Sequence, residues 1–300
     1  MMNKDFFQEV ILDEIRNRLP NDVDVKTGEV IKNNDKKLQC LSFTSEASNC
    51  SPVIYIDDIY NDYLSGTSVE DVADKAVDLY YNHAGSLDTT GFLNRDFVLN
   101  NVFYKMRNNE MNTDSLNNVP TQRISGIDDI VLVPYITLNL KNDVGKGYIK
   151  ISNKLIDSIG ISVEELDEAA KNNTDSSRFS VRKMSDLIGE MTGMQMEDNN
   201  FYVVLDSKYD SASIFADPDY AGFISSKTGL DDYYIIPSSI HELIIVDAKD
   251  GGAEKLHAII SEVNVSMCKT DILSYNFYEC KDGVVNTICA DRSLENDMEL

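Results

Sequence analysis

The feature that constrains this chain most is a pair of apolar runs that meet at a proline-serine corner, in the stretch DYYIIPSSIHELIIVDAK at 232–249. The runs at 233–236 and 243–246 are rich in β-branched and aromatic residues, which predicts two strands. Because each run is continuously apolar, both faces of these strands should be covered, so we expect central strands of a sheet. Pro237 has no amide hydrogen and should end the first strand.

Four polar side chains at this corner are the candidate catalytic residues: Ser238, Ser239, His241 and Glu242. In one interpretation they only satisfy backbone groups where the sheet turns, since buried polar groups are nearly always paired. In the other they line a hydrolase-like pocket, in which a serine is activated by a base such as His241. We favour the first interpretation, and the sequence leaves both open.

Other catalytic and cofactor chemistry has little support in the sequence. The segment HELII at 241–245 departs from the zinc motif HExxH, because Ile245 occupies the place of the second histidine. His257 is a lone histidine on a predicted helix, and neither a phosphate-binding glycine pattern nor a GxSxG motif is present. We therefore predict no cofactor and no metal site.

Charge and cysteine usage limit the classes of partner. The 300 residues include 27 basic and 51 acidic side chains, a net charge of −24 that would repel phosphate backbones, so no direct nucleic-acid binding is expected. Five scattered cysteines without a CxxC pair indicate free thiols in a reducing compartment.

No apolar run approaches the ~18 residues of a membrane span. We expect a cytoplasmic protein with no membrane contact.

Hydrophobic periodicity predicts an alternation of helices and strands along the chain. Amphipathic helices are expected at 3–19, 67–81, 184–191, 218–229 and 253–265. Strands are expected at 53–56, 130–138, 147–151 and 201–205, with hairpins at 23–43 and 275–288. These elements predict an α+β fold, a mixed or mainly antiparallel sheet or sheets with amphipathic helices packed on them. We expect an N-terminal region at 1–140, a C-terminal region at 141–290 and a frayed acidic tail at 291–300.

An internal similarity links two distant segments. GTSVED at 66–71 has a counterpart in GISVEE at 160–165, and with one single-residue gap the match covers 54–76 and 149–170. A duplication would give two similar α+β subdomains, whereas convergence would mean only that two helices use the same serine or threonine caps, Thr67 or Ser68 in the first copy. We favour convergence.

Three segments carry a family resemblance. They are SPVIYIDDIYNDYLSG at 51–66, GYIKISNKLIDSIGISVEELDEAA at 147–170, and YYIIPSSIHELIIV at 233–246, followed by EVN at 262–264. Together they resemble an uncharacterised bacterial family known only as a domain of unknown function, and IPSSIHE at 236–242 is the most specific element. The resemblance implies a bacterial, cytoplasmic protein of mixed α and β structure, with no activity or catalytic residue to transfer.

The functional hypothesis is a non-catalytic protein-interaction or regulatory module with a protein partner. It rests on the low histidine content, three in all, and on fifteen tyrosines, a residue type that often anchors interfaces. One alternative is a hydrolase-like enzyme using the corner of Ser238, Ser239, His241 and Glu242. A second alternative is an acidic inhibitor that mimics nucleic-acid charge.

Overall fold

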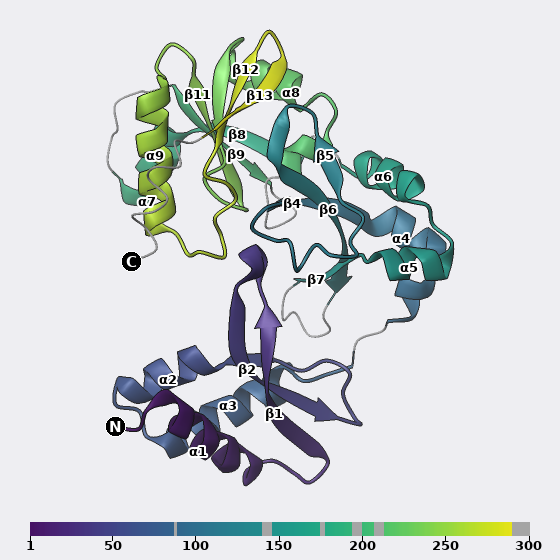
Figure 1. The fold of residues 1–300 in the computed structure, drawn as a ribbon, viewed down its shortest axis with the longest axis vertical. Coiled ribbons are helices and arrows are strands. Elements are labelled where there is room, and N and C mark those ends of the chain that lie inside the picture. The colour runs from purple at the N-terminus through teal and green to yellow at the C-terminus, as the bar shows by residue number, and fades with distance from the viewer. Residues whose placement is uncertain (87–88, 140–145, 175–177, 194–199, 207–212, 290–300) are drawn as a thin grey trace. The chain divides into compact units, whose positions relative to one another are not determined.

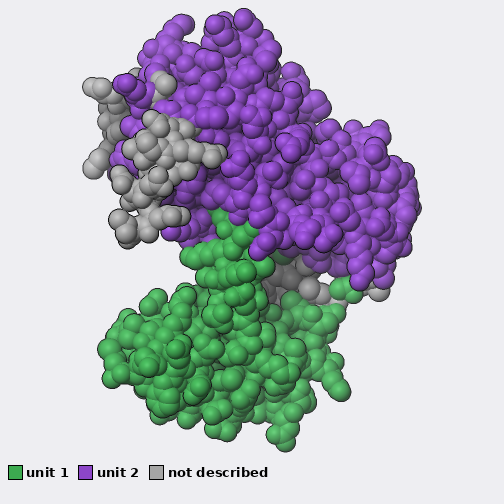
Figure 2. Space-filling view, in the orientation of Figure 1, with its two compact units in different colours: residues 1–91, 138–147 green, residues 92–137, 148–300 purple. Residues whose placement is uncertain are grey.

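The computed structural model describes residues 1–86, 89–139, 146–174, 178–193, 200–206 and 213–289. Its helices and antiparallel sheets confirm the predicted α+β class. The chain forms two compact units, unit 1 (residues 1–91 and 138–147) and unit 2 (residues 92–137 and 148–300), coloured separately in Figure 2. The chain passes from one unit to the other near residues 91, 137 and 147. The predicted tail at 291–300 lies outside the described residues.

Unit 1 is a three-stranded antiparallel sheet with its helices on one face (Figure 1). Its elements are α1 (Lys4–Arg16), β1 (Val23–Ile31), the 3-10 helix η1 (Asn33–Asp35), β2 (Lys37–Ser45), β3 (Val53–Tyr55), α2 (Ile56–Leu64) and α3 (Val69–His83). The strand order is β1-β2-β3. Val25 pairs with Phe43 and Leu41 with Ile54, and these buried side chains point to the same face, where the helices cover them.

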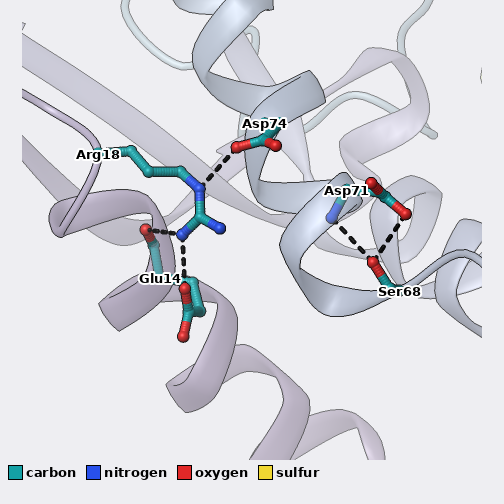
Figure 3. A network of polar contacts seen from close by, with 5 residues as sticks. All are labelled: Glu14, Arg18, Ser68, Asp71 and Asp74. Atoms are coloured by element: carbon teal, nitrogen blue, oxygen red, sulfur yellow. Dashed lines mark hydrogen bonds and ion pairs between the residues drawn. The ribbon is translucent and has the colours of Figure 1, made fainter.

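Polar contacts join α1 to α3 at the surface of unit 1 (Figure 3). Arg18 donates to the carboxylates of Glu14 and Asp74, with its Nε 2.6 Å from the Asp74 oxygen. Ser68 caps α3 by accepting from the Asp71 backbone N–H at 3.1 Å, so of the two expected candidates Ser68, and not Thr67, is the cap. These groups are partly or fully exposed to solvent, which weakens such ion pairs, so the buried residues of α1 and α3 provide most of the stability of this contact.

The region at 90–172, most of which belongs to unit 2, repeats this order of elements. The 3-10 helix η2 (Thr90–Leu93) precedes α4 (Arg95–Asn101), β4 (Val102–Asn108), β5 (Gln122–Ile124), β6 (Ile127–Asn139), β7 (Lys146–Lys150), α5 (Asn153–Ile159) and α6 (Val163–Asn172). Strand β6 pairs with β4, β5 and β7. If the short strand β5 is left out, both regions have the element order α-β-β-β-α-α. The central strand of the sheet is β2 in the first region and β6 in the second.

A proline is tolerated inside β6 because of where its partners end. On one side of β6, Pro134 lies opposite Tyr104 of β4. The backbone N–H of Ile151 donates to the Pro134 carbonyl at 2.9 Å, and it must approach from the other side of β6. On that side β5 reaches only as far as Leu132. Pro134 therefore lies between two partner strands, where its missing N–H removes no ladder bond that the sheet depends on.

The rest of unit 2 is a six-stranded antiparallel sheet in the order β13-β12-β10-β11-β9-β8. Its elements are β8 (Phe179–Lys183), α7 (Met184–Thr192), β9 (Phe201–Asp206), the 3-10 helix η4 (Ser213–Ala216), α8 (Tyr220–Thr228), β10 (Tyr233–Ile236), β11 (Glu242–Asp247), α9 (Ala253–Ser266), β12 (Phe277–Lys281) and β13 (Val284–Ile288). Strands β10 and β11 are interior, as their continuous apolar runs predicted. Helix α9 covers one face (Figure 1), and the Tyr233 hydroxyl donates to the Ala221 carbonyl of α8 on the other.

In the part of the chain that is described, no helix combines the length and the apolar character needed to cross a membrane.

Candidate functional site

The predicted corner is the connection between β10 and β11, and it is tightly closed. Ser238 and Ser239 are 2% and 5% exposed, whereas His241 is exposed at the surface. The strands on either side pair from Ile236 with Ile244 onward, so the seven residues at 237–243 form the connection, and β11 begins within it at Glu242. The four candidates are thus neighbours in space, but the histidine faces solvent while the serines face inward.

Both serine hydroxyls of the corner are engaged within the turn. Ser238 Oγ donates to the Glu242 carbonyl at 3.2 Å and lies 3.5 Å from its carboxylate, and Ser239 Oγ accepts from the backbone N–H of His241 at 3.0 Å. The N–H of Ile240 donates to the Asp271 carbonyl at 2.9 Å and ties the turn to the segment after α9. These contacts are the ones expected if the polar groups satisfy the backbone where the sheet turns.

The second histidine considered for a metal site serves as a packing residue. His257 on α9 lies with its ring 5.0 Å from that of Phe277, at 75° between the ring planes, which is an edge-on aromatic contact. Within the described ranges, no group of three or more histidine, cysteine, aspartate or glutamate side chains is arranged to hold a metal ion.

A buried polar cluster that the sequence did not reveal surrounds Asp129 of β6. This carboxylate is 5% exposed and accepts hydrogen bonds from the Tyr278 hydroxyl at 2.9 Å, from Asn108 Nδ2 at 3.3 Å and from Ser274 Oγ. Burial, followed by the charge of Asp129, raises the pKa of Tyr278 well above its usual value, so the phenol remains a donor. The cluster attaches β6 and β4 to the start of β12.

The same cluster extends to Asn264, the last residue of the EVN segment on α9. Its Nδ2 donates to the Ser274 carbonyl at 3.1 Å, while its buried Oδ1 has no hydrogen-bond partner among the described residues. If the Asn264 amide were flipped, its Oδ1 would face the Ser274 carbonyl oxygen, and two acceptors would be in contact. The hydrogen bond from Nδ2 therefore determines the orientation of the amide. The cluster is enclosed by protein, which fits a structural role better than contact with a substrate.

A close backbone approach supports this connection between the two sheets of unit 2. Gly126, in the turn before β6, has a φ of 78°, and a Cβ there would lie 1.7 Å from the Val285 carbonyl oxygen of β13. Thr287 Oγ1 donates to the Gly126 carbonyl and accepts from the Asp128 N–H, both at 3.0 Å. Only glycine fits this position, for both its conformation and its space.

Unit 1 offers a different kind of surface, the outer edge of β1. The backbone groups of successive residues in a strand point alternately to its two sides. Arg16 Nη2 donates to the Val25 carbonyl at 3.2 Å from outside the sheet, so Val25, Thr27, Glu29 and Ile31 direct their backbone groups away from β2. In the described structure no strand other than β2 pairs with β1, and the side chains of Thr27, Glu29 and Ile31 are exposed.

The corresponding strand of unit 2 has a covered edge. Asn173, immediately after α6, donates through Nδ2 to the carbonyls of Leu99 and Val102 at 2.8 and 2.9 Å. The 3-10 helix η4 also packs beside β4. Among the residues that the structure describes, Arg16 is the one side chain that donates to the outer edge of β1, and residues 27–31 are left open.

Comparison with protein-family models gives one match, which covers residues 4–281 and therefore nearly the whole chain. The chain belongs to the family of unknown function DUF5688. This membership confirms the resemblance to an uncharacterised family that the segments at 51–66 and 233–246 indicated. Neither the curated proteins nor the solved structures gave a significant match. DUF5688 is a family of unknown function, and its membership assigns no activity to this chain.

Proposed function

We propose that this DUF5688 protein is a non-catalytic protein-interaction module and that its partner adds a strand to the open edge of β1. The observation that supports this proposal is the set of outward backbone groups at Thr27, Glu29 and Ile31, whose N–H and C=O groups have no partner strand in the described structure. An unpaired edge of this kind is a template for another extended chain. Strand addition supplies main-chain hydrogen bonds for affinity and side-chain contacts for specificity.

The hydrolase-like alternative has weaker support. A nucleophilic serine needs a base within hydrogen-bond reach and a hydroxyl that can approach a substrate. Ser238 and Ser239 are buried and already bound to backbone groups of the turn, and the contact from His241 to Ser239 uses the backbone N–H. The corner therefore supports an architectural role for its four polar residues.

The charge and the thiols indicate what kind of partner to expect. A net charge of −24 favours a protein partner with basic groups and disfavours direct nucleic-acid binding. None of the five cysteines forms a disulfide in the described structure, and Cys40 and Cys280 are buried, where burial raises the pKa of both thiols. Free thiols of this kind are typical of a reducing compartment, and we propose a cytoplasmic partner.

The proposal can be tested with two proline substitutions on one rung of the hairpin. Glu29 of β1 lies directly opposite Gln39 of β2, and both amides point away from the other strand. Glu29→Pro removes a donor from the open edge of β1, whereas Gln39→Pro places the same ring on the opposite side of the hairpin. Tagged full-length chains would be cross-linked in the native host, and the captured proteins quantified by mass spectrometry.

We expect a partner that is enriched equally by the unsubstituted chain and Gln39→Pro and is lost with Glu29→Pro. Circular dichroism and thermal melting would establish that each variant is folded. If Glu29→Pro fails to fold, Thr27→Pro blocks the same edge two residues away. A captured set that does not change when the β1 edge of a folded variant is blocked would contradict the proposal.

A further inference from the structure

Building on the proposed function, we infer that the segment that binds β1 is an extended strand with a lysine or arginine opposite Glu29. The open part of the edge is short, because Arg16 already occupies the Val25 carbonyl. Residues 27–31 remain open, so the partner segment that pairs here is about five residues long. An extended strand has a rise of about 3.3 Å per residue. Glu29 is at the centre of this stretch.

The Glu29 carboxylate is an exposed negative charge on the open stretch of β1. It accepts one hydrogen bond from Gln39 Nε2 at 3.4 Å, and no ion pair to it is present among the described residues. By contrast, Asp24 on the same strand is paired with Lys26 at 2.6 Å, and this contact lowers the pKa of Asp24. Opposite charges that face each other across adjacent strands stabilise the pairing, whereas like charges destabilise it. Glu29 is therefore the charged position on β1 that a partner would complement.

The same charges disfavour a second copy of this chain as the occupant. Two antiparallel β1 strands centred on the open stretch would place Glu29 directly opposite its own copy. Each chain also carries a net charge of −24, which adds repulsion over a longer range. A basic segment of another protein avoids both penalties.

Thr27 and Ile31, on either side of Glu29, determine which residues are expected at the other positions of the partner segment. Thr27 and Ile31 point to the same face as Glu29, and Ile31 is 47% exposed. β-Branched or other apolar residues opposite Thr27 and Ile31 would cover this surface, since such cross-strand pairs are favourable. The expected segment therefore has a basic residue flanked, two positions away on each side, by apolar or β-branched residues.

The test is a selection of random nine-residue peptides displayed on phage against immobilised full-length protein. Separate selections would use the unsubstituted chain, Glu29→Pro, Gln39→Pro and the charge reversal Glu29→Lys. We expect the first selection to enrich the basic-centred pattern. Peptides from it should bind Gln39→Pro equally and Glu29→Pro at least tenfold more weakly, and Glu29→Lys should enrich an acidic residue at the central position.

The outcomes separate this inference from the proposed function. The inferred charge would be refuted if the selected peptides require the open edge but have no preference for a basic central residue. It would also be refuted if selection against Glu29→Lys enriches the same central residue as selection against the unsubstituted chain. Either result would leave the proposal of strand addition intact. Peptides that bind Glu29→Pro as well as the unsubstituted chain, or an absence of enrichment, would count against both. Folding of each variant would again be verified by circular dichroism.

Discussion

The regions 1–83 and 94–172 have the same order of elements but different surroundings. Each has a first helix capped by asparagine, Asn3 or Asn94, which accepts from the backbone N–H of a phenylalanine three residues later. Each also has a last helix capped by serine, Ser68 or Ser162, with a third strand and a short helix before it. The first region keeps an open sheet edge, whereas unit 2 covers the edge of the second.

This comparison bears on the interpretation of the internal similarity. Convergent capping accounts for two helix starts, but it does not account for six elements in the same order with the same central strand. The buried positions of the last helices also correspond, since Val72 and Ala76 occupy the places of Leu166 and Ala170. The difference between the regions teaches that one architecture can keep an open sheet edge or become part of a larger core, depending on which residues pack against its outer edge.

The largest effect should come from the buried carboxylate that attaches the second region to the C-terminal sheet. Asp129→Ala leaves the donors of Tyr278, Asn108 and Ser274 without their acceptor, and we expect a loss of about 3 to 5 kcal/mol in the stability of unit 2. Urea unfolding followed by circular dichroism would measure it. The exposed neighbour Asp128 provides the control, since Asp128→Ala should change stability little; equal effects would contradict the assigned role of the cluster.

The next largest effects should come from substitutions at corresponding core positions of the two regions, which test whether the two regions are stabilised independently. Leu166→Ala should cost about 3 kcal/mol and Val72→Ala roughly 2 kcal/mol, because both side chains are fully enclosed and leave cavities. Hydrogen exchange measured by mass spectrometry would locate each effect. We expect faster exchange in unit 2 for the first variant and in unit 1 for the second, and a uniform change over both units would show that they unfold together.

Alkaline pH should affect unit 2 through Tyr278. Burial and the charge of Asp129 raise its pKa in the folded state, so the protonated phenol contributes stability that is intact below the unfolded pKa of about 10 and is lost above it. The loss should be about 1.4 kcal/mol for each pH unit until the folded pKa is reached. Tyrosinate absorbance and circular dichroism would be recorded together. Ionisation of this phenol without loss of structure would argue against its burial beside Asp129.

The smallest effects should come from the matched serine caps. Ser162 and the side chain of Glu165 form a reciprocal capping box at α6, and Arg95 lowers the pKa of Glu165. Ser68 also bonds the carboxylate of Asp71. Ser162→Ala and Ser68→Ala should each cost about 1 kcal/mol, measured by thermal melting. Substitution to threonine at each position is the control, since it keeps the hydroxyl and should retain most of the stability.

Much of the fold could be predicted because its signals are local. The runs at 233–236 and 243–246 indicated interior strands, and Asn3 and Gly229 mark the predicted ends of α1 and α8. The buried cluster could not be predicted, since Asp129 meets Ser274 and Tyr278 across 145 and 149 residues of sequence. In the sequence Asp128 and Asp129 are two adjacent acids, a pattern typical of a strand edge or turn, where acids commonly solvate and cap. Only the packing of β6 shows that Asp129 is buried and Asp128 is not.

The sequence by itself determined where many of the longer helices and strands of this protein lie, because caps, turns and hydrophobic periodicity act over a few residues. It also determined the strong negative charge that any partner must accommodate. The tertiary structure decided which strands became neighbours, which carboxylate was buried and which sheet edge was left open. These outcomes depend on contacts between residues far apart in the chain, and no local pattern records them.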